Sequence, residues 1–167
     1  QSFGVILSFS VHRKLRPLKV LGLLLVTQVG FMTACTSQLQ RLKDTKQCSG
    51  CDLRRVDLRG LDLQGANLQA ADLKFANFAG TNLQEANLSE ANLQAADLSE
   101  ANLTKANLQK ARLFLTQLEK ANLEGAQLSG ANLGFADLTG AKVSEEQLQQ
   151  AQLCSTTFPD GNKSKNC

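Results

Sequence analysis

The chain has 167 residues, with 18 Lys and Arg against 15 Asp and Glu, and therefore a formal net charge of +3. It has no Trp or Tyr, and its one His, His12, lies near the start, so the remainder of the chain cannot build a histidine-based catalytic or metal site. Residues 35–167 keep 14 basic and 15 acidic residues, a net charge of −1. That balance argues against the basic surface of a nucleic-acid-binding protein.

Residues 1–34 have the layout of a secretory signal. The apolar stretch 20–32 follows four basic residues, Arg13, Lys14, Arg16 and Lys19. It ends at Met32-Thr33-Ala34-Cys35, which resembles a bacterial lipoprotein cleavage box with Cys35 as the lipid-bearing residue. Cleavage near Ala34 without lipid, or an uncleaved anchor, are the alternatives, although the apolar run is short for a membrane-spanning helix. The sequence predicts export, with membrane attachment only through the leader or a lipidated Cys35.

Residues 35–47 are predicted to form a short N-terminal capping helix. Leu39 and Leu42 lie three residues apart in an otherwise polar segment, and Thr36 or Ser37 could cap the helix. Such a helix would cover one end of the segment that follows.

Residues 48–143 are dominated by a period of five. A Leu or near-equivalent falls on every fifth residue from Leu53 to Val143, nineteen times in succession, and a small residue, mostly Ala, lies two positions before each. In an α-helix or a flat strand, Leu residues five positions apart would lie on several different faces. A chain that turns a corner after each quintet keeps every Leu and Ala inside, and four such sides close a square.

The exposed charged residues give an independent test of whether one circuit takes four quintets. If one circuit takes twenty residues, residue n stacks on residue n+20 at roughly the ~4.8 Å spacing of neighbouring strands. Three opposite-charge pairs then lie one above the other: Glu85 with Lys105, Glu90 with Lys110, and Glu100 with Lys120. Each exposed pair contributes only about 0.2–1 kcal/mol, so the pairs report the register more than they stabilise it.

Quintets such as Ala66-Asn67-Leu68-Gln69-Ala70 and Ala101-Asn102-Leu103-Thr104-Lys105 closely resemble the pentapeptide-repeat proteins. The known fold of that family is a right-handed quadrilateral β-helix. The resemblance implies an all-β solenoid, a right-handed quadrilateral parallel β-helix of about five coils with four pentapeptides per coil and short α-helical caps. It does not by itself imply a function.

Residues 144–167 are predicted to form a C-terminal capping helix and a loose tail. Ser144 and Gln147 have the spacing of a capping box, so a helix is expected over 144–152. Alternatively, Ala151-Gln152-Leu153 could resume the repeat. The segment from Phe158 onward is rich in turn residues and then polar, and is expected to be loose.

The four cysteines after Cys35 lie in two pairs, Cys48 with Cys51 and Cys154 with Cys167. Cys48-Ser49-Gly50-Cys51 could be a redox pair, half of a zinc site, or two small structural residues that are disulfide-bonded. The absence of His after the leader argues against zinc, and the repeat supplies neither a base nor a helix start for redox chemistry. About five coils would separate the two pairs by roughly 20–25 Å, whereas disulfide partners need Cα atoms within about 7 Å. Only Cys48–Cys51 and Cys154–Cys167 can therefore pair within one chain.

Acidic residues recur on one side of the predicted column, at Asp57, Asp97 and Asp137, alternating with Asn77 and Gln117. They could be imagined to hold calcium, but side chains that support the turns are a simpler interpretation. We expect no catalytic, cofactor or metal site, and no enzymatic activity.

One corner of the predicted column differs from the other three. It carries Arg55, Phe75, Ala95, Leu115 and Phe135, with Phe114 adjacent, where the other corners carry Gly, Ala, Glu or Lys. These residues could be ordinary scattered surface groups or could support the turns. Otherwise they form an interaction strip for a partner protein or for self-association, made of Phe75, Phe114, Leu115 and Phe135.

Three functions compete. The first is a non-enzymatic structural or protein-interaction module outside the cytoplasm, and the resemblance to cyanobacterial family members with a leader implies the periplasm or the thylakoid lumen. The second is inhibition of DNA gyrase by mimicry of DNA, as in cytoplasmic family members, which the leader and the charge of −1 argue against. The third is a thiol–disulfide redox sensor through Cys48 and Cys51.

Overall fold

The computed structural model describes residues 37–164. The predicted leader 1–34, the lipidation candidate Cys35 and the predicted disulfide partner Cys167 lie outside the described residues. Within residues 37–164, no helix is both long and apolar enough to span a membrane.

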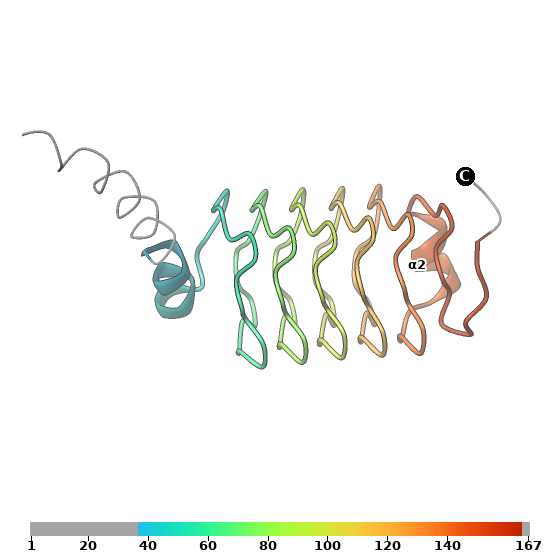
Figure 1. Ribbon diagram of the computed structural model, residues 1–167, viewed down its shortest axis with the longest axis horizontal. Coiled ribbons are helices and arrows are strands. Elements are labelled where there is room, and N and C mark those ends of the chain that lie inside the picture. Colours follow the sequence, from blue (N-terminus) through green and yellow to red (C-terminus); the bar gives the residue numbers. More distant parts are fainter. Residues whose placement is uncertain (1–36, 165–167) are drawn as a thin grey trace, which may run out of the picture.

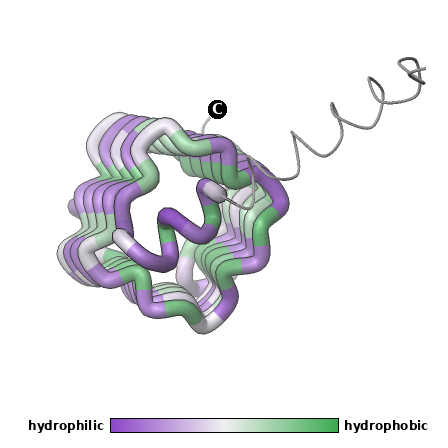
Figure 2. The backbone as a smooth tube through the Cα atoms, turned by 90° about the vertical axis from the view of Figure 1, so that its left-hand side faces the viewer, coloured by the Kyte–Doolittle hydropathy of each residue, from purple (hydrophilic) through white to green (hydrophobic). Residues whose placement is uncertain are grey.

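The repeat forms an elongated column of stacked coils (Figure 1). Parallel β-bridges join residues twenty positions apart in a nearly unbroken series, from Gln47 with Asn67 to Asp137 with Thr157. Each coil both donates backbone hydrogen bonds to the next coil and accepts them from it: the Leu53 N–H donates to the Asp72 carbonyl at 2.8 Å, and the Asp72 N–H donates to the Cys51 carbonyl at 2.9 Å. Each circuit therefore takes four quintets, and successive coils superpose when viewed along the column (Figure 2).

Each quintet ends in a tight turn, and we call the residue two positions after the Leu-type centre the corner residue. In one such turn the Leu61 N–H donates to the Leu58 carbonyl at 3.2 Å, and the corner residue Gly60 has φ of +63°. Corner residues that are not glycine have the same left-handed backbone, for example Glu85 at +57° and Lys105 at +56°. This requirement was not predicted from the sequence, although the recurrence of Gly in this one slot is its signal.

The column axis is filled by the Leu and Ala side chains, which are buried in every full coil. Phe78 replaces one Leu and is fully buried. Where Thr occupies the small slot, its hydroxyl donates to the carbonyl 23 residues earlier, as in Thr81 to Leu58 at 2.7 Å and Thr116 to Leu93 at 2.9 Å. Within the described part of the chain, no buried polar side-chain atom lacks a hydrogen-bond partner.

The recurrent acids support turns, in agreement with the simpler interpretation of the sequence. Asp57, Asp97 and Asp137 each accept a hydrogen bond from the backbone N–H two residues later, at 3.2, 2.9 and 2.9 Å. Asn77 does the same at 3.0 Å. No group of three or more His, Cys, Asp or Glu residues gathers at metal-binding distance between residues 37 and 164.

Helices lie at both ends of the column (Figure 1). The first is described over residues 37–45, and its Leu42 is fully buried in the same apolar cluster as the repeat. The second, α2, spans Glu145–Gln149 and begins with the predicted capping box between Ser144 and Gln147.

Helix α2 is shorter than the expected helix over 144–152, because the repeat resumes directly after it: Gln152 bridges Asn132, and Thr157 bridges Asp137. The two alternatives drawn from the sequence are thus both partly right. The helix takes the Gln147 backbone out of the β-ladder. The Gln147 side-chain amide donates instead to the Ala126 carbonyl at 2.8 Å, so this acceptor stays satisfied. The same amide also donates at 2.8 Å to the Leu123 carbonyl, which accepts the Ala126 N–H as well.

Residues 158–164 form a hairpin in place of the expected loose tail. Thr157 and Lys163 make an antiparallel bridge, and the Phe158 N–H donates to the Asn162 carbonyl at 2.7 Å. The turn closes on Gly161, whose φ of +84° suits glycine. The turn residues seen in the sequence therefore build an ordered turn here.

The predicted charge pairs are only partly formed, although their register is right. Between residues 37 and 164, only Glu100 with Lys120 of the three pairs comes within ion-pair distance, at 3.9 Å. Long exposed side chains gain too little from such a contact to be held in one geometry.

Candidate interaction site

The differing corner forms a continuous edge along the column, and we call Arg55, Phe75, Ala95, Leu115 and Phe135 the apolar corner. Phe75, Leu115 and Phe135 are 55%, 52% and 49% exposed, and they are the large apolar residues that the described part of the chain exposes. All five corner residues have φ between +53° and +60°. Each of the other three corners contains at least two glycines, whereas this one contains none.

An aromatic cluster covers the C-terminal half of the apolar corner. The rings of Phe114 and Phe135 are 5.3 Å apart between centroids and meet edge to face at 66°. Gly134 makes room for this contact, since a Cβ there would lie 3.2 Å from the Phe114 ring. The role of Gly134 was not predicted from the sequence, where its signal is a glycine outside the corner slot.

The N-terminal half of the apolar corner is basic. The Arg55 guanidinium lies 5.6 Å from the centroid of the Phe75 ring, a cation–π contact. Between residues 37 and 164, Arg55 forms no ion pair. Neighbouring Arg54 pairs with Asp52 at 2.6 Å, and this hydrogen bond lowers the pKa of the Asp52 carboxyl. The apolar corner thus changes along its length from a cationic to an aromatic surface.

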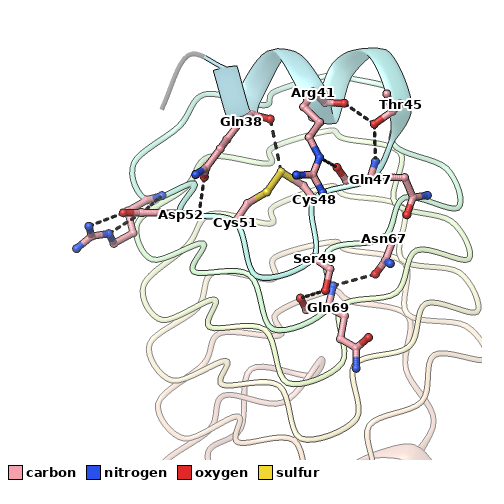
Figure 3. Close-up of a disulfide and its surroundings, with 11 residues drawn as sticks. Gln38, Arg41, Thr45, Gln47, Cys48, Ser49, Cys51, Asp52, Asn67 and Gln69 are labelled. Carbon is pink, nitrogen blue, oxygen red and sulfur yellow. Dashed lines mark hydrogen bonds and ion pairs between the residues drawn. A yellow bond between two sulfur atoms is a disulfide. The ribbon is translucent and has the colours of Figure 1, made fainter. Parts of the chain in front are cut away.

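The predicted disulfide between Cys48 and Cys51 is formed, with Cα atoms 5.3 Å apart. Cys48 is 0% and Cys51 is 6% exposed, because the two occupy the axial Leu and Ala slots of the first turn. The helix over residues 37–45 lies directly on the disulfide (Figure 3): the Gln38 carbonyl oxygen is 3.5 Å from Cys48 Sγ, and the Gln38 side chain accepts the Asp52 N–H at 2.8 Å. Cys154 is also disulfide-bonded, and its predicted partner, Cys167, lies outside the described residues.

A depression of about 480 Å³ lies at the C-terminal end of the column, between α2 and the hairpin. It is lined mainly by apolar residues, among them Leu148, Leu153 and Phe158, with the acids Glu145 and Asp160 at its rim. No nucleophile paired with a base lines it, so its residues do not have the arrangement of a catalytic site.

Known families and structures match the repeat. A family model described as "Pentapeptide repeat region" matches residues 51–128, and a second, "Pentapeptide repeats (8 copies)", matches residues 116–144. The chain belongs to the pentapeptide-repeat family. Proteins of this family form right-handed quadrilateral β-helices, so the predicted fold class is confirmed at that level.

Among solved structures, this pentapeptide-repeat protein is similar to Rfr23 from the cyanobacterium Cyanothece 51142, with 30% identity, a TM-score of 0.64, and coverage of 77% of this chain and 97% of that one. It is also similar to a pentapeptide repeat protein of the Arabidopsis thaliana thylakoid lumen, with 31% identity, a TM-score of 0.56, and coverage of 69% and 85%. The plasmid-mediated fluoroquinolone resistance protein QnrB1 matches at 21% identity and a TM-score of 0.33 over 67% of this chain and 70% of that one, too slight a likeness to bear on function. No curated protein sequence matches the chain.

Proposed function

We propose that this pentapeptide-repeat protein is a non-enzymatic interaction module that works outside the cytoplasm and docks a partner protein along its apolar corner. The observation that carries the proposal is the set of half-exposed side chains Phe75, Leu115 and Phe135 on left-handed backbone. A residue with a Cβ costs roughly 1–2 kcal/mol more in this conformation than glycine does. The other three corners place glycine or, for the most part, charged residues at these slots, whereas this corner places large apolar side chains in water, so a binding role explains them better.

The shape and charge of the apolar corner indicate the chemistry of the partner. The edge is convex, because its residues lie at turns of the column, so it fits a concave apolar groove rather than a flat surface. At its N-terminal end, Arg55 has no carboxylate partner between residues 37 and 164, whereas the neighbouring Arg54 and Lys74 are paired with Asp52 and Asp72. We therefore expect a partner with an apolar groove and an acidic group at one end.

Substitution of the apolar corner tests the proposal. Leu115→Ser with Phe135→Ser should leave folding intact and abolish capture of the partner from the native compartment. The matched control is Glu85→Ser with Lys105→Ser, at the equivalent slots of another corner, which should capture as the wild type does. Unchanged capture by the first variant refutes the proposal, and equal loss in both variants shows that the effect is not specific to this corner. Light scattering on the same proteins distinguishes a second copy of this chain from a different partner.

Export is part of the same proposal and is supported by the layout of residues 1–34 and by the lumenal origin of one similar protein. Fractionation of cells that express the full chain should place it outside the cytoplasm. A lipid label that is lost with Cys35→Ser would identify lipidation, whereas an unlabelled protein of the same size would exclude it. Recovery in the cytoplasm would refute the location.

DNA mimicry receives little support from the surface charges. A DNA mimic needs a continuous acidic surface, but the carboxylates of the first coils are paired: Asp52 with Arg54 at 2.6 Å and Asp57 with Arg59 at 2.7 Å. Along the column, Lys105 follows Glu85 on the same corner. A gyrase supercoiling assay is expected to show no inhibition.

A further inference from the structure

We propose that the Cys48–Cys51 disulfide is a thiol–disulfide exchange site shielded by the helix over residues 37–45, so that its reduction and the release of this helix from the column are coupled. The inference does not depend on the apolar corner and goes beyond the docking function. It assigns a chemical role to the N-terminal end of the column, where the disulfide lies directly under the helix over residues 37–45.

The helix closes access to both sulfur atoms. Exchange requires a thiolate to reach one of the two bonded sulfurs. Cys48 is fully buried and Cys51 nearly so, with the Gln38 carbonyl 3.5 Å from Cys48 Sγ (Figure 3). Leu42 of the same helix is fully buried in one apolar cluster with both cysteines. A reductant as large as a dithiol therefore cannot reach the bond while the helix is docked.

No β-bridge joins residues 37–45 to a coil, so this part of the helix can leave without unfolding the coils. Its apolar anchors are the fully buried Leu42 and the partly buried Leu39. Two hydrogen bonds join its side chains to the first coil: Gln38 Oε1 accepts the Asp52 N–H at 2.8 Å, and Arg41 Nε donates to the Gln47 carbonyl at 2.9 Å. Most of residues 37–45 are exposed, so docking buries little of this segment. Segments of this kind open locally at a small fraction of the global stability.

The disulfide in turn supports the surface on which the helix docks. In later coils the axial slots hold Leu and Ala, and a further coil packs on either side. At Cys48 and Cys51 the next coil lies on one side only, and the joined sulfurs form one compact apolar group across the Ser49-Gly50 turn. Two separate thiols are bulkier and leave this turn less constrained, so the docking of Leu42 and Gln38 is weakened.

The exchange is balanced with an external dithiol as the reductant. The dithiol loses two electrons and two protons and becomes a cyclic disulfide, and the Cys48–Cys51 bond takes up both electrons and both protons to give two thiols. The first thiolate attacks Cys51 Sγ, which belongs to the less buried of the two residues, and Cys48 leaves as the thiolate. The helix is then free to release, and the Asp52 N–H loses its acceptor.

The rate of reduction tests the shielding. Oxidised protein is treated with dithiothreitol, the thiols are trapped with N-ethylmaleimide, and Cys48 and Cys51 are followed by peptide mass spectrometry, which separates them from Cys154. Leu42→Ala weakens docking and should speed reduction about tenfold or more, whereas Lys43→Ala, on the exposed side of the same helix, should reduce as the wild type does. Equal rates in wild type and Leu42→Ala would overturn the proposal, and so would slow reduction in a Leu42→Ala protein whose helix is already undocked.

Hydrogen exchange tests the coupling. After reduction, the amides of residues 37–48 should exchange about tenfold faster or more, while those of residues 87–127 remain unchanged. The control is Cys48→Leu with Cys51→Ala, which places the usual repeat residues in both slots, and its helix should not respond to dithiothreitol. Unchanged protection of residues 37–48 in the reduced wild type would overturn the inference even if the docking function holds.

Discussion

Leu113 and Leu115 lie two residues apart in one turn, and their removal should have very different effects. Leu113 points to the column axis and is fully buried. Leu115 is a corner residue, 52% exposed, with φ of +60°. Substituting each in turn therefore compares the contribution of an axial position with that of a corner position in a single quintet.

The magnitudes follow from burial and backbone conformation. Leu113→Ala loses the transfer free energy of the removed carbons and leaves a cavity between two coils, which costs about 2–5 kcal/mol. Leu115→Gly relieves roughly 1–2 kcal/mol of left-handed strain. Against this stand about 1 kcal/mol of lost partial burial and about 0.5–1 kcal/mol of added freedom in the unfolded chain. The net change for Leu115→Gly is therefore within ~1 kcal/mol of zero.

Urea denaturation followed by far-ultraviolet circular dichroism measures both variants against the wild type under the same conditions. We expect a clear fall in the midpoint for Leu113→Ala and almost none for Leu115→Gly. A cost above about 2 kcal/mol for Leu115→Gly would show that this side chain supports the column, and the case for a binding role at the apolar corner would fail with it.

Three further outcomes are expected. The hydrogen bond from the Arg59 side chain lowers the pKa of Asp57 from 3.8 to about 2, so this carboxylate stabilises the folded state above pH ~4 and loses that effect as the pH falls toward 2. In Arg59→Ala, a carbon-detected NMR titration should show the pKa of Asp57 moving up toward its ordinary value. An unmoved pKa would exclude Arg59 as the cause. Thr116→Val removes one of two donors to the buried Leu93 carbonyl, which still accepts the Ala96 N–H at 3.0 Å. It should cost about 0.5–1.5 kcal/mol in urea denaturation, whereas a neutral result would show that this hydrogen bond does not stabilise the column. Gln147→Ala removes the side-chain amide that donates to the Ala126 carbonyl and adds a second bond to the Leu123 carbonyl. It should speed hydrogen exchange around α2 while the exchange of the central coils stays unchanged; uniform exchange would contradict this local role.

The apolar corner shows how far sequence reasoning carries to the candidate site. The twenty-residue spacing placed Phe75, Leu115 and Phe135 on one edge, and the structure exposes each of them by about half. The edge-to-face contact of Phe114 with Phe135 could not be predicted from the repeat pattern, because it depends on the absence of a side chain at Gly134 in the next coil. Neighbours in the stack are far apart in the chain, so such contacts appear only once the coils are assembled.

The sequence alone determined which side chains fill the column axis, because Leu and Ala with a strict period of five can all be buried only if the chain turns after every quintet. The spacing of the cysteines allowed an intramolecular disulfide only between two cysteines at the same end of the column. The tertiary structure decided the five-residue length of α2, the return of the repeat at Gln152 and which charged side chains form ion pairs. Each quintet carries its own Leu and Ala, and the Gly in some corner slots signals the left-handed backbone there. Helix length and side-chain pairing depend instead on the neighbouring coil, which lies twenty residues away in the sequence.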